Sequence, residues 1–161
     1  MEPRGHLRPR LSVRPRRRAR AVKTFFDTNV LAYAVDASDP ARQDAAIERF
    51  ARAGREGKIV LSTQVLQEFY HVTTHKLQPP LSAAEAARQL ARLSAFEVVG
   101  ASAQSVLAAA ELARKHRLQW WDALILEAAL RAGADVLVTE DGQHGQRFGS
   151  LVIENPFDGA A

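Results

Sequence analysis

The feature that most constrains the fold of this chain is a repeated order of short apolar runs and longer helical stretches. Residues 22–26 read Val-Lys-Thr-Phe-Phe, which is typical of a short buried strand, and a helical stretch follows almost at once. The same order recurs further along the chain. Strands that alternate with helices predict an α/β fold in which right-handed crossovers join the strands of a mostly parallel sheet.

Cap and stop residues place the other elements. We expect helices over residues 30–35, 41–56, 63–76, 82–94, 102–116 and 120–132, and strands over residues 59–61, 96–99, 136–138 and, at the edge of the sheet, 151–153. Ser82 and Glu85 have the spacing of a capping box. Ile47 and Phe50 are expected on the inner face of the second helix. Gly133 is expected to end the last helix.

The composition indicates one domain of an ordinary globular protein. The chain has 161 residues, of which 47% are hydrophobic, enough for a real core. We expect no transmembrane helix, because no apolar run reaches about 18 residues. The basic N-terminus lacks the apolar region of a secretory signal. With no cysteine the chain has neither a disulfide nor a thiolate metal site, and we expect it to be cytoplasmic.

Charge is distributed unevenly along the chain. Residues 1–20 hold eight Arg and one Glu, whereas the other 141 residues hold 14 basic and 17 acidic side chains. A basic arm of this kind can bind RNA phosphates or an acidic partner. The alternatives are a disordered extension, or a segment outside the natural protein if translation starts at Val22 through a GTG codon. We therefore expect an Arg-rich, disordered extension over residues 1–20 and one domain over residues 22–157.

Four carboxylates occupy equivalent places next to the predicted strands. Asp27 ends the first strand, Glu68 lies in the helix after strand 59–61, Asp122 lies in the first turn of a helix, and Asp141 follows strand 136–138. In a parallel sheet these places can converge on the edge where ligands bind. Each acid alone could be an ordinary cap or surface charge.

Four converging carboxylates would repel one another, and a divalent cation is the simplest way to hold them together. Oxygen ligands without cysteine favour Mg²⁺ or Mn²⁺. Such ions support phosphodiester hydrolysis by activating water and stabilising the leaving oxygen. The acids therefore predict a metal-dependent hydrolase.

The segments around these acids occur in the order of a known set of motifs. They read Phe-Phe-Asp27-Thr28-Asn29, Leu-Gln-Glu68-Phe, Trp-Trp-Asp122-Ala-Leu and Val-Thr139-Glu-Asp141. Over residues 22–157 the chain resembles the PIN-domain ribonucleases, in particular the VapC-type toxins of bacterial toxin–antitoxin pairs. The resemblance implies an α/β/α sandwich with a central, mostly parallel sheet of four to five strands. It also implies a Mg²⁺- or Mn²⁺-dependent endoribonuclease, a homodimer, and a small antitoxin protein that blocks the site.

The resemblance also assigns individual residues. The four acidic positions that bind metal and carry catalysis are matched by Asp27, Glu68, Asp122 and Asp141. The supporting positions are matched by Thr28 and Asn29, which would orient Asp27, and by the hydroxyl of Thr139. Glu140 ranks lower because the family varies at that position. The Arg-rich segment lies outside the family pattern.

Several aromatic and imidazole side chains allow two readings. His71 and His75 share a helix face with the second acid, but solvated or core-edge histidines are favoured over metal ligands. His144 follows the fourth acid and can contact substrate, although an ordinary loop position is favoured. Trp120 and Trp121 can stack on a base, but packing at a helix start is the favoured interpretation.

Other functions compete with the nuclease. One is a catalytically inactive PIN-fold binding or regulatory module, which the four intact acids argue against. Another is a housekeeping nuclease that processes RNA. A metal phosphatase is a third, but the Asp-x-Asp signature of such enzymes is absent at Asp27-Thr28-Asn29.

Overall fold

The structure is a computed structural model that describes residues 20–159, and its centre is a six-stranded sheet. Its strands are β1 (Val22–Phe26), β2 (Gly57–Ser62), β3 (Glu97–Val99), β4 (Val136–Val138), β5 (Arg147–Phe148) and β6 (Leu151–Glu154). They are ordered β3-β2-β1-β4-β6-β5, and every neighbouring pair is parallel except β5 with β6. Residues 1–19 lie outside the described part, so the predicted Arg-rich extension is not tested.

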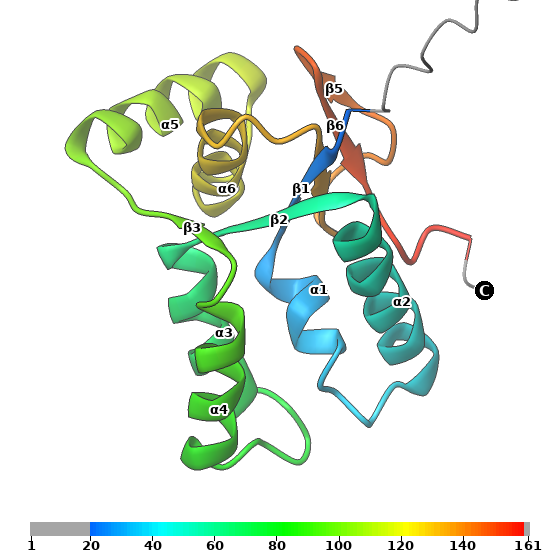
Figure 1. Cartoon of the computed structure of the whole chain (residues 1–161). Coiled ribbons are helices and arrows are strands. Elements are labelled where there is room, and N and C mark those ends of the chain that lie inside the picture. Colours follow the sequence, from blue (N-terminus) through cyan, green and yellow to red (C-terminus); the bar gives the residue numbers. More distant parts are fainter. Residues whose placement is uncertain (1–19, 160–161) are drawn as a thin grey trace, which may run out of the picture.

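Six helices cover the sheet: α1 (Thr28–Tyr33), α2 (Pro40–Glu56), α3 (Thr63–His75), α4 (Ala83–Leu93), α5 (Ala103–His116) and α6 (Trp120–Arg131). Figure 1 shows α5 and α6 on one side of the sheet and α1 to α4 on the other. The chain passes from β1 through β2 to β3 in one direction across the sheet and then returns to β4 beyond β1. Right-handed crossovers place the helices of these two routes on opposite faces. The predicted α/β/α sandwich with a mostly parallel sheet is therefore confirmed.

The sheet differs from the prediction at its C-terminal edge. It has six strands rather than four to five, and β6 lies inside the sheet rather than at its edge. The edge strand is β5, which pairs antiparallel with β6 through Phe148 and Leu151. A strand of two residues is too short to produce an alternating pattern, so no pattern in the sequence predicts it.

Caps account for most helix boundaries. Ser82 and Glu85 form the predicted capping box at α4, and Ser62 caps α3 by accepting a hydrogen bond from the Val65 amide. Gly133 follows α6 in the left-handed region, with φ +68°, which is the usual glycine ending of a helix. The first helix begins earlier than predicted, at Thr28 rather than Val30, because Asp27 itself is the N-cap.

Phenylalanines join the sheet to the helices above it. Phe25 and Phe26 of β1 are fully buried, and the ring of Phe26 packs on Phe50 of α2 with centroids 5.0 Å apart. Ile47 was expected on the same inner face but is 49% exposed. None of the helices within residues 20–159 has the length and apolar character needed to cross a membrane.

A buried ion pair ties α2 to the end of β6. Arg49 is 4% exposed, and its Nε and Nη2 donate to the two carboxylate oxygens of Glu154 at 2.6 and 3.0 Å. Arg52 donates to the same carboxylate at 2.8 Å. The guanidinium of Arg49 also lies over the ring of Phe26, 5.9 Å from its centroid. This pair holds α2 against the end of β6.

Candidate active site

The predicted site residues gather where the strand order of the sheet reverses. The chain leaves β1 toward β2 on one side, and β4 later pairs with the other side of β1. In open α/β sheets the crevice beyond such a switch point is the usual ligand site. Phe26 is aligned with Val138, and the amide of Asp27 donates to the Val138 carbonyl at 3.0 Å. Asp27 and Thr139 therefore emerge side by side at this edge.

Asp27 is the most buried of the four acids. The residue is 6% exposed, and both carboxylate oxygens accept hydrogen bonds. Oδ1 accepts from the Thr28 amide at 2.7 Å, and Oδ2 accepts from the hydroxyl of Thr139 at 2.8 Å. The pKa of Asp27 is raised to about 7: burial raises it most, the two hydrogen bonds lower it, and the charges of Asp141 and Glu68 raise it.

Thr139 and Asn29 link Asp27 to Asp141. The hydroxyl of Thr139, which is buried, accepts from the Asp141 amide at 3.0 Å while it donates to Asp27. The side-chain amide of Asn29 donates to Asp141 Oδ2 at 2.9 Å and lies 3.4 Å from the Thr139 hydroxyl. Both supporting residues thus contact the acids, although Asn29 orients Asp141 rather than Asp27.

Thr28 connects the first helix to Glu68. Its hydroxyl donates to Glu68 Oε2 at 3.1 Å, and Gln64, one turn earlier on α3, donates to Oε1 at 2.8 Å. Thr28 was predicted to orient Asp27. Its backbone amide donates to Asp27, whereas its side-chain hydroxyl donates to Glu68. Gln64 was missed in the sequence, although its i,i+4 spacing from Glu68 on a helix was a usable signal.

Asp122 stands on the opposite wall, in the first turn of α6. Its pKa is raised, chiefly by burial and then by the charges of Asp141 and Glu68. These two acids therefore act on both Asp27 and Asp122, so the four predicted acids form one electrostatic group. Within residues 20–159 no Lys or Arg forms an ion pair with any of the four.

The group is looser than a formed metal centre. Among the described residues, no three His, Asp or Glu side chains are close enough together to hold one ion. Glu68 and Asp141 instead take hydrogen bonds from the neutral donors Thr28, Gln64 and Asn29. Coordination of one ion by three of the acids therefore requires side chains to rearrange.

Glu140 turns away from the four acids. Its carboxylate lies 3.7 Å from Arg42 of α2 and accepts from the hydroxyl of Tyr33 at 3.4 Å. Arg42 also donates to the Tyr33 hydroxyl and stacks over that ring, 5.0 Å from its centroid. A carboxylate already neutralised by an arginine is a weaker metal ligand, which agrees with its lower rank.

A groove of about 620 Å³ opens beside Glu68. It is lined from α3 by Gln64, Gln67, Glu68, His71, Val72 and the adjoining Lys76, and from α6 by Trp121. The favoured interpretation of Trp121 as a packing residue is wrong, because its side chain is 64% exposed. His71 is exposed and stacks on His75, with ring centroids 4.7 Å apart, as expected for solvated histidines.

His144 lies away from the acids. It borders a cavity of about 350 Å³ that it shares with Arg49, Arg52 and Glu154. Its Nδ1 accepts from the Asn155 amide at 3.1 Å, which holds the loop that follows β4. The structural interpretation of this histidine, favoured in the sequence, accounts for what it contacts.

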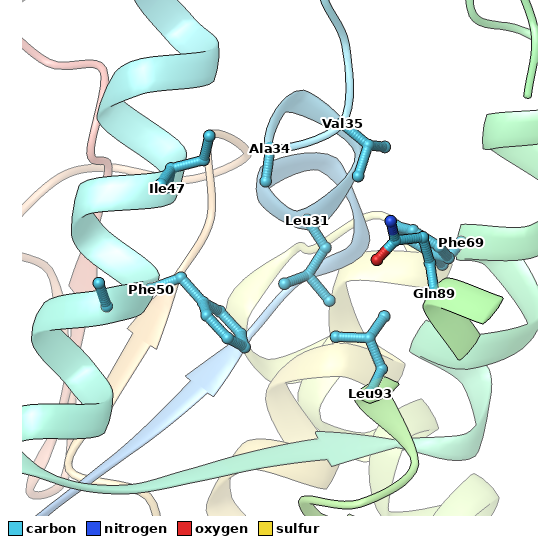
Figure 2. A pocket seen from close by; sticks show the side chains of 9 residues that line it. Leu31, Ala34, Val35, Ile47, Phe50, Phe69, Gln89 and Leu93 are labelled. Carbon is cyan, nitrogen blue, oxygen red and sulfur yellow. The ribbon is translucent and has the colours of Figure 1, made fainter. Parts of the chain in front are cut away.

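A separate apolar cavity of about 350 Å³ lies between α1, α2 and α4. Figure 2 shows Leu31, Phe50 and Leu93 pointing toward one another across it, with Ile47 at its rim. Ile47 is exposed because no described element covers the rim of the cavity where its side chain lies. Among the residues of positions 20–159 that line this cavity there is no carboxylate, so it is not part of the candidate active site.

Comparisons with known proteins identify the fold. The family model described as PIN domain matches residues 24–147. No curated protein matches the chain. Similar solved structures include VapBC2 from Rickettsia felis bound to a DNA fragment from the promoter, with 21% identity over 83% of this chain and 98% of the other and a TM-score of 0.61.

Two further structures are alike to a similar degree. Mycobacterium tuberculosis VapC20, described as a Sarcin-Ricin loop cleaving toxin, has 21% identity over 74% of this chain and 91% of the other, with a TM-score of 0.60. DNA-bound VapBC from Salmonella typhimurium has 22% identity over 84% of this chain and 98% of the other, with a TM-score of 0.59. At these identities the likeness concerns the fold, and the family match covers more than half of the chain. The chain belongs to the PIN domain family.

Proposed function

We propose that this protein is a metal-dependent endoribonuclease whose four carboxylates bind Mg²⁺ or Mn²⁺. The observation that carries the proposal is the group formed by Asp27, Glu68, Asp122 and Asp141 at the switch point of a PIN fold. Two of these acids have a raised pKa, and none has a cationic partner within residues 20–159. A buried carboxylate without a neutralising partner is costly, which favours a site built to receive a cation.

The chemistry of the donors fits a hard divalent ion. All four candidate ligands offer carboxylate oxygens, which Mg²⁺ and Mn²⁺ prefer. When bound, such an ion would activate a water and stabilise the leaving oxygen of the scissile phosphodiester. The domain boundaries we propose for this activity are residues 22–157, with residues 1–20 as an extension.

The chain's own residues would prepare the site. Thr139 and the Thr28 amide hold the Asp27 carboxylate in one orientation, and Asn29 holds Asp141. Glu68 is held between Thr28 and Gln64. The oxygens are thus positioned by neutral donors that leave their negative charge available to a cation.

We further propose that the enzyme is a toxin that acts in the cytoplasm as a homodimer and is inhibited by a cognate antitoxin protein. The support is the likeness in fold to chains from VapBC structures and to a toxin that cleaves the Sarcin-Ricin loop. A housekeeping nuclease of the same fold is the alternative. Growth arrest on expression of the protein alone, relieved by the protein encoded next to it, is expected of a toxin; harmless expression of an active nuclease would favour the housekeeping role.

The decisive experiment is RNA cleavage by purified variants in Mg²⁺ and in Mn²⁺. We expect Asp27→Asn and Asp122→Asn to lose cleavage, because each loses one charged oxygen ligand. Asp44→Asn is the matched control, since it removes the same charge from an exposed position on α2. Mn²⁺ should also raise the melting temperature of the unaltered protein but not that of Asp27→Asn. Full activity of Asp27→Asn in Mg²⁺ would refute the metal-site proposal.

A further inference from the structure

The side chain next to one of the proposed ligands is unusually exposed for its size. Trp121 precedes Asp122, and 64% of its surface is open to solvent. A large aromatic ring in water loses the burial energy that usually keeps tryptophan in the core, and exposed aromatic surface marks interaction sites. Trp120, by comparison, is 39% exposed.

Amide and imidazole side chains share a groove with Trp121. Trp121 borders the groove of about 620 Å³ whose other wall carries Gln64, Gln67 and His71 of α3. Amide side chains both donate and accept hydrogen bonds, so they suit the edges of an unstacked base. An aromatic ring facing such donors is the arrangement that holds a base by stacking and by its edge.

A second groove continues this surface toward Asn29. It has a volume of about 390 Å³, is bordered by Asn29, Tyr33 and Glu140, and shares Val72 and Lys76 with the first groove. Lys76 is exposed at this junction. Its ammonium group is therefore placed where the backbone of a strand running from one groove to the other would cross α3.

We propose that Trp121 is a stacking platform for one base of single-stranded RNA and that Lys76 contacts a phosphate of the same strand. The inference rests on the proposed nuclease function and adds how the substrate is held. An unpaired base lies on the indole ring, close to Glu68 and Asp122.

A second copy of the chain is the competing occupant of this surface. Apolar residues that suit such a contact lie on the outer helices, where Leu107 is 69% and Val106 is 41% exposed on α5. Trp121 instead borders a groove that also contains Glu68, one of the proposed ligands, and Lys76, and this favours RNA. Contact between copies is an outcome that the test below separates.

The test measures binding of a short, fluorescently labelled single-stranded RNA in the Asp27→Asn background, where the RNA is not cut. Stacking on an aromatic ring is worth about 1–3 kcal/mol per base, or about 5- to 150-fold in Kd. We expect Trp121→Ala to raise Kd by about 5- to 25-fold, the lower part of that range, because the ring remains open on one face. Trp121→Phe should retain most of the affinity. Leu107→Ala, the exposed control on α5, should bind RNA as tightly as the Asp27→Asn protein without it.

The same RNA with one base removed at a time identifies the stacked base. At one position of the RNA, loss of the base should weaken binding by the Asp27→Asn protein. The same loss should not weaken binding by the Asp27→Asn protein that also carries Trp121→Ala. The Lys76 contact has a different signature, because each phosphate contact on a single strand contributes about 0.7 to the salt slope. Lys76→Gln should lower the slope of log K against log salt by about that amount, whereas Trp121→Ala should leave it unchanged.

Two results would overturn the inference. One is equal affinity of Trp121→Ala and Leu107→Ala for the intact RNA. The other is a Trp121→Ala protein that changes its oligomeric state, measured by light scattering, while its RNA affinity stays the same. Failure of the nuclease proposal would appear separately, as absence of RNA cleavage by the unaltered protein in Mg²⁺ and Mn²⁺.

Discussion

Replacing Asp27 by Asn tests the electrostatic account of the site through stability alone. In the folded protein the pKa of Asp27 is raised from its ordinary value of 3.8 to about 7, first of all by burial. The Asp27 carboxyl group therefore binds its proton more tightly in the folded protein than in the unfolded chain. The resulting stability is fully present below pH 3.8 and is lost as the pH rises through about 7.

The size of the effect follows from the two pKa values. At 1.36 kcal/mol for each pH unit, the rise from 3.8 to about 7 costs the folded protein about 4 kcal/mol at pH 8. Between pH 5 and pH 8 the same two values predict a loss of about 2–3 kcal/mol. Asparagine carries no charge at either pH, so the variant should escape this loss.

The new amide recovers only part of that energy. Its oxygen can still accept from the Thr28 amide, but its NH₂ faces the Thr139 hydroxyl, which already accepts from the Asp141 amide. One poorly made buried hydrogen bond costs about 1 kcal/mol. We therefore expect Asp27→Asn to be more stable than the unaltered protein by about 2–3 kcal/mol at pH 8. At about 2–4 °C per kcal/mol for a chain of this size, the melting temperature should rise by about 4–12 °C.

The measurement is thermal or urea unfolding at pH 5 and at pH 8 in EDTA, so that no divalent ion contributes. Asp44→Asn, which removes an exposed carboxylate from α2, should follow the unaltered protein at both pH values. If the unaltered protein and Asp27→Asn change stability in parallel between pH 5 and pH 8, Asp27 does not titrate as its burial requires. The electrostatic account of the site would then be wrong.

Two further substitutions test the supporting contacts. Asn29→Ala removes the donor that holds Asp141 at 2.9 Å. We expect kcat on a labelled RNA to fall by about 10- to 100-fold, and the melting temperature to stay within a few degrees of that of the unaltered protein. Arg49→Met breaks the buried pair with Glu154, and we expect it to cost about 2–3 kcal/mol in urea unfolding, less than a fully buried pair because Arg52 still contacts Glu154. The exposed pair of Arg55 with Glu48 is the matched control, and Arg55→Met should cost less than about 1 kcal/mol.

The sequence predicted those features of the fold that depend on local signals. The strand at residues 22–26 and the Ser82 capping box were confirmed, because an apolar run and a cap can be recognised within a few residues. The short edge strand β5 was missed, since Arg147 and Phe148 acquire their role only by pairing with β6. Ile47 was placed inside because its helical period matches that of Phe50, but nothing in residues 20–159 covers the rim where it lies.

The sequence predicted which residues lie near one another at the candidate site, but not the contacts between them. Each acid has a recognisable place beside a strand or helix start, and Asp27 and Thr139 meet because β1 and β4 are neighbours. That pairing joins residues more than 100 positions apart, so no local pattern contains it. Trp121 was assigned to packing because the sequence shows only that it lies at the start of α6. Whether a neighbouring element covers its side chain depends on the whole fold.

The burial of Asp27 is costly to the fold, and this cost bears on the proposed function. A stable domain typically has about 5–15 kcal/mol of stability, so a penalty of about 4 kcal/mol at Asp27 is a large fraction of the total. Sequence and structure otherwise agree at β1: the strand is apolar, its partners are in register, and Phe25 and Phe26 are fully buried. Proteins depart from such consistency mainly where function requires it. A buried carboxylate held by Thr28 and Thr139 but paired with no Lys or Arg of residues 20–159 therefore supports the proposed cation site.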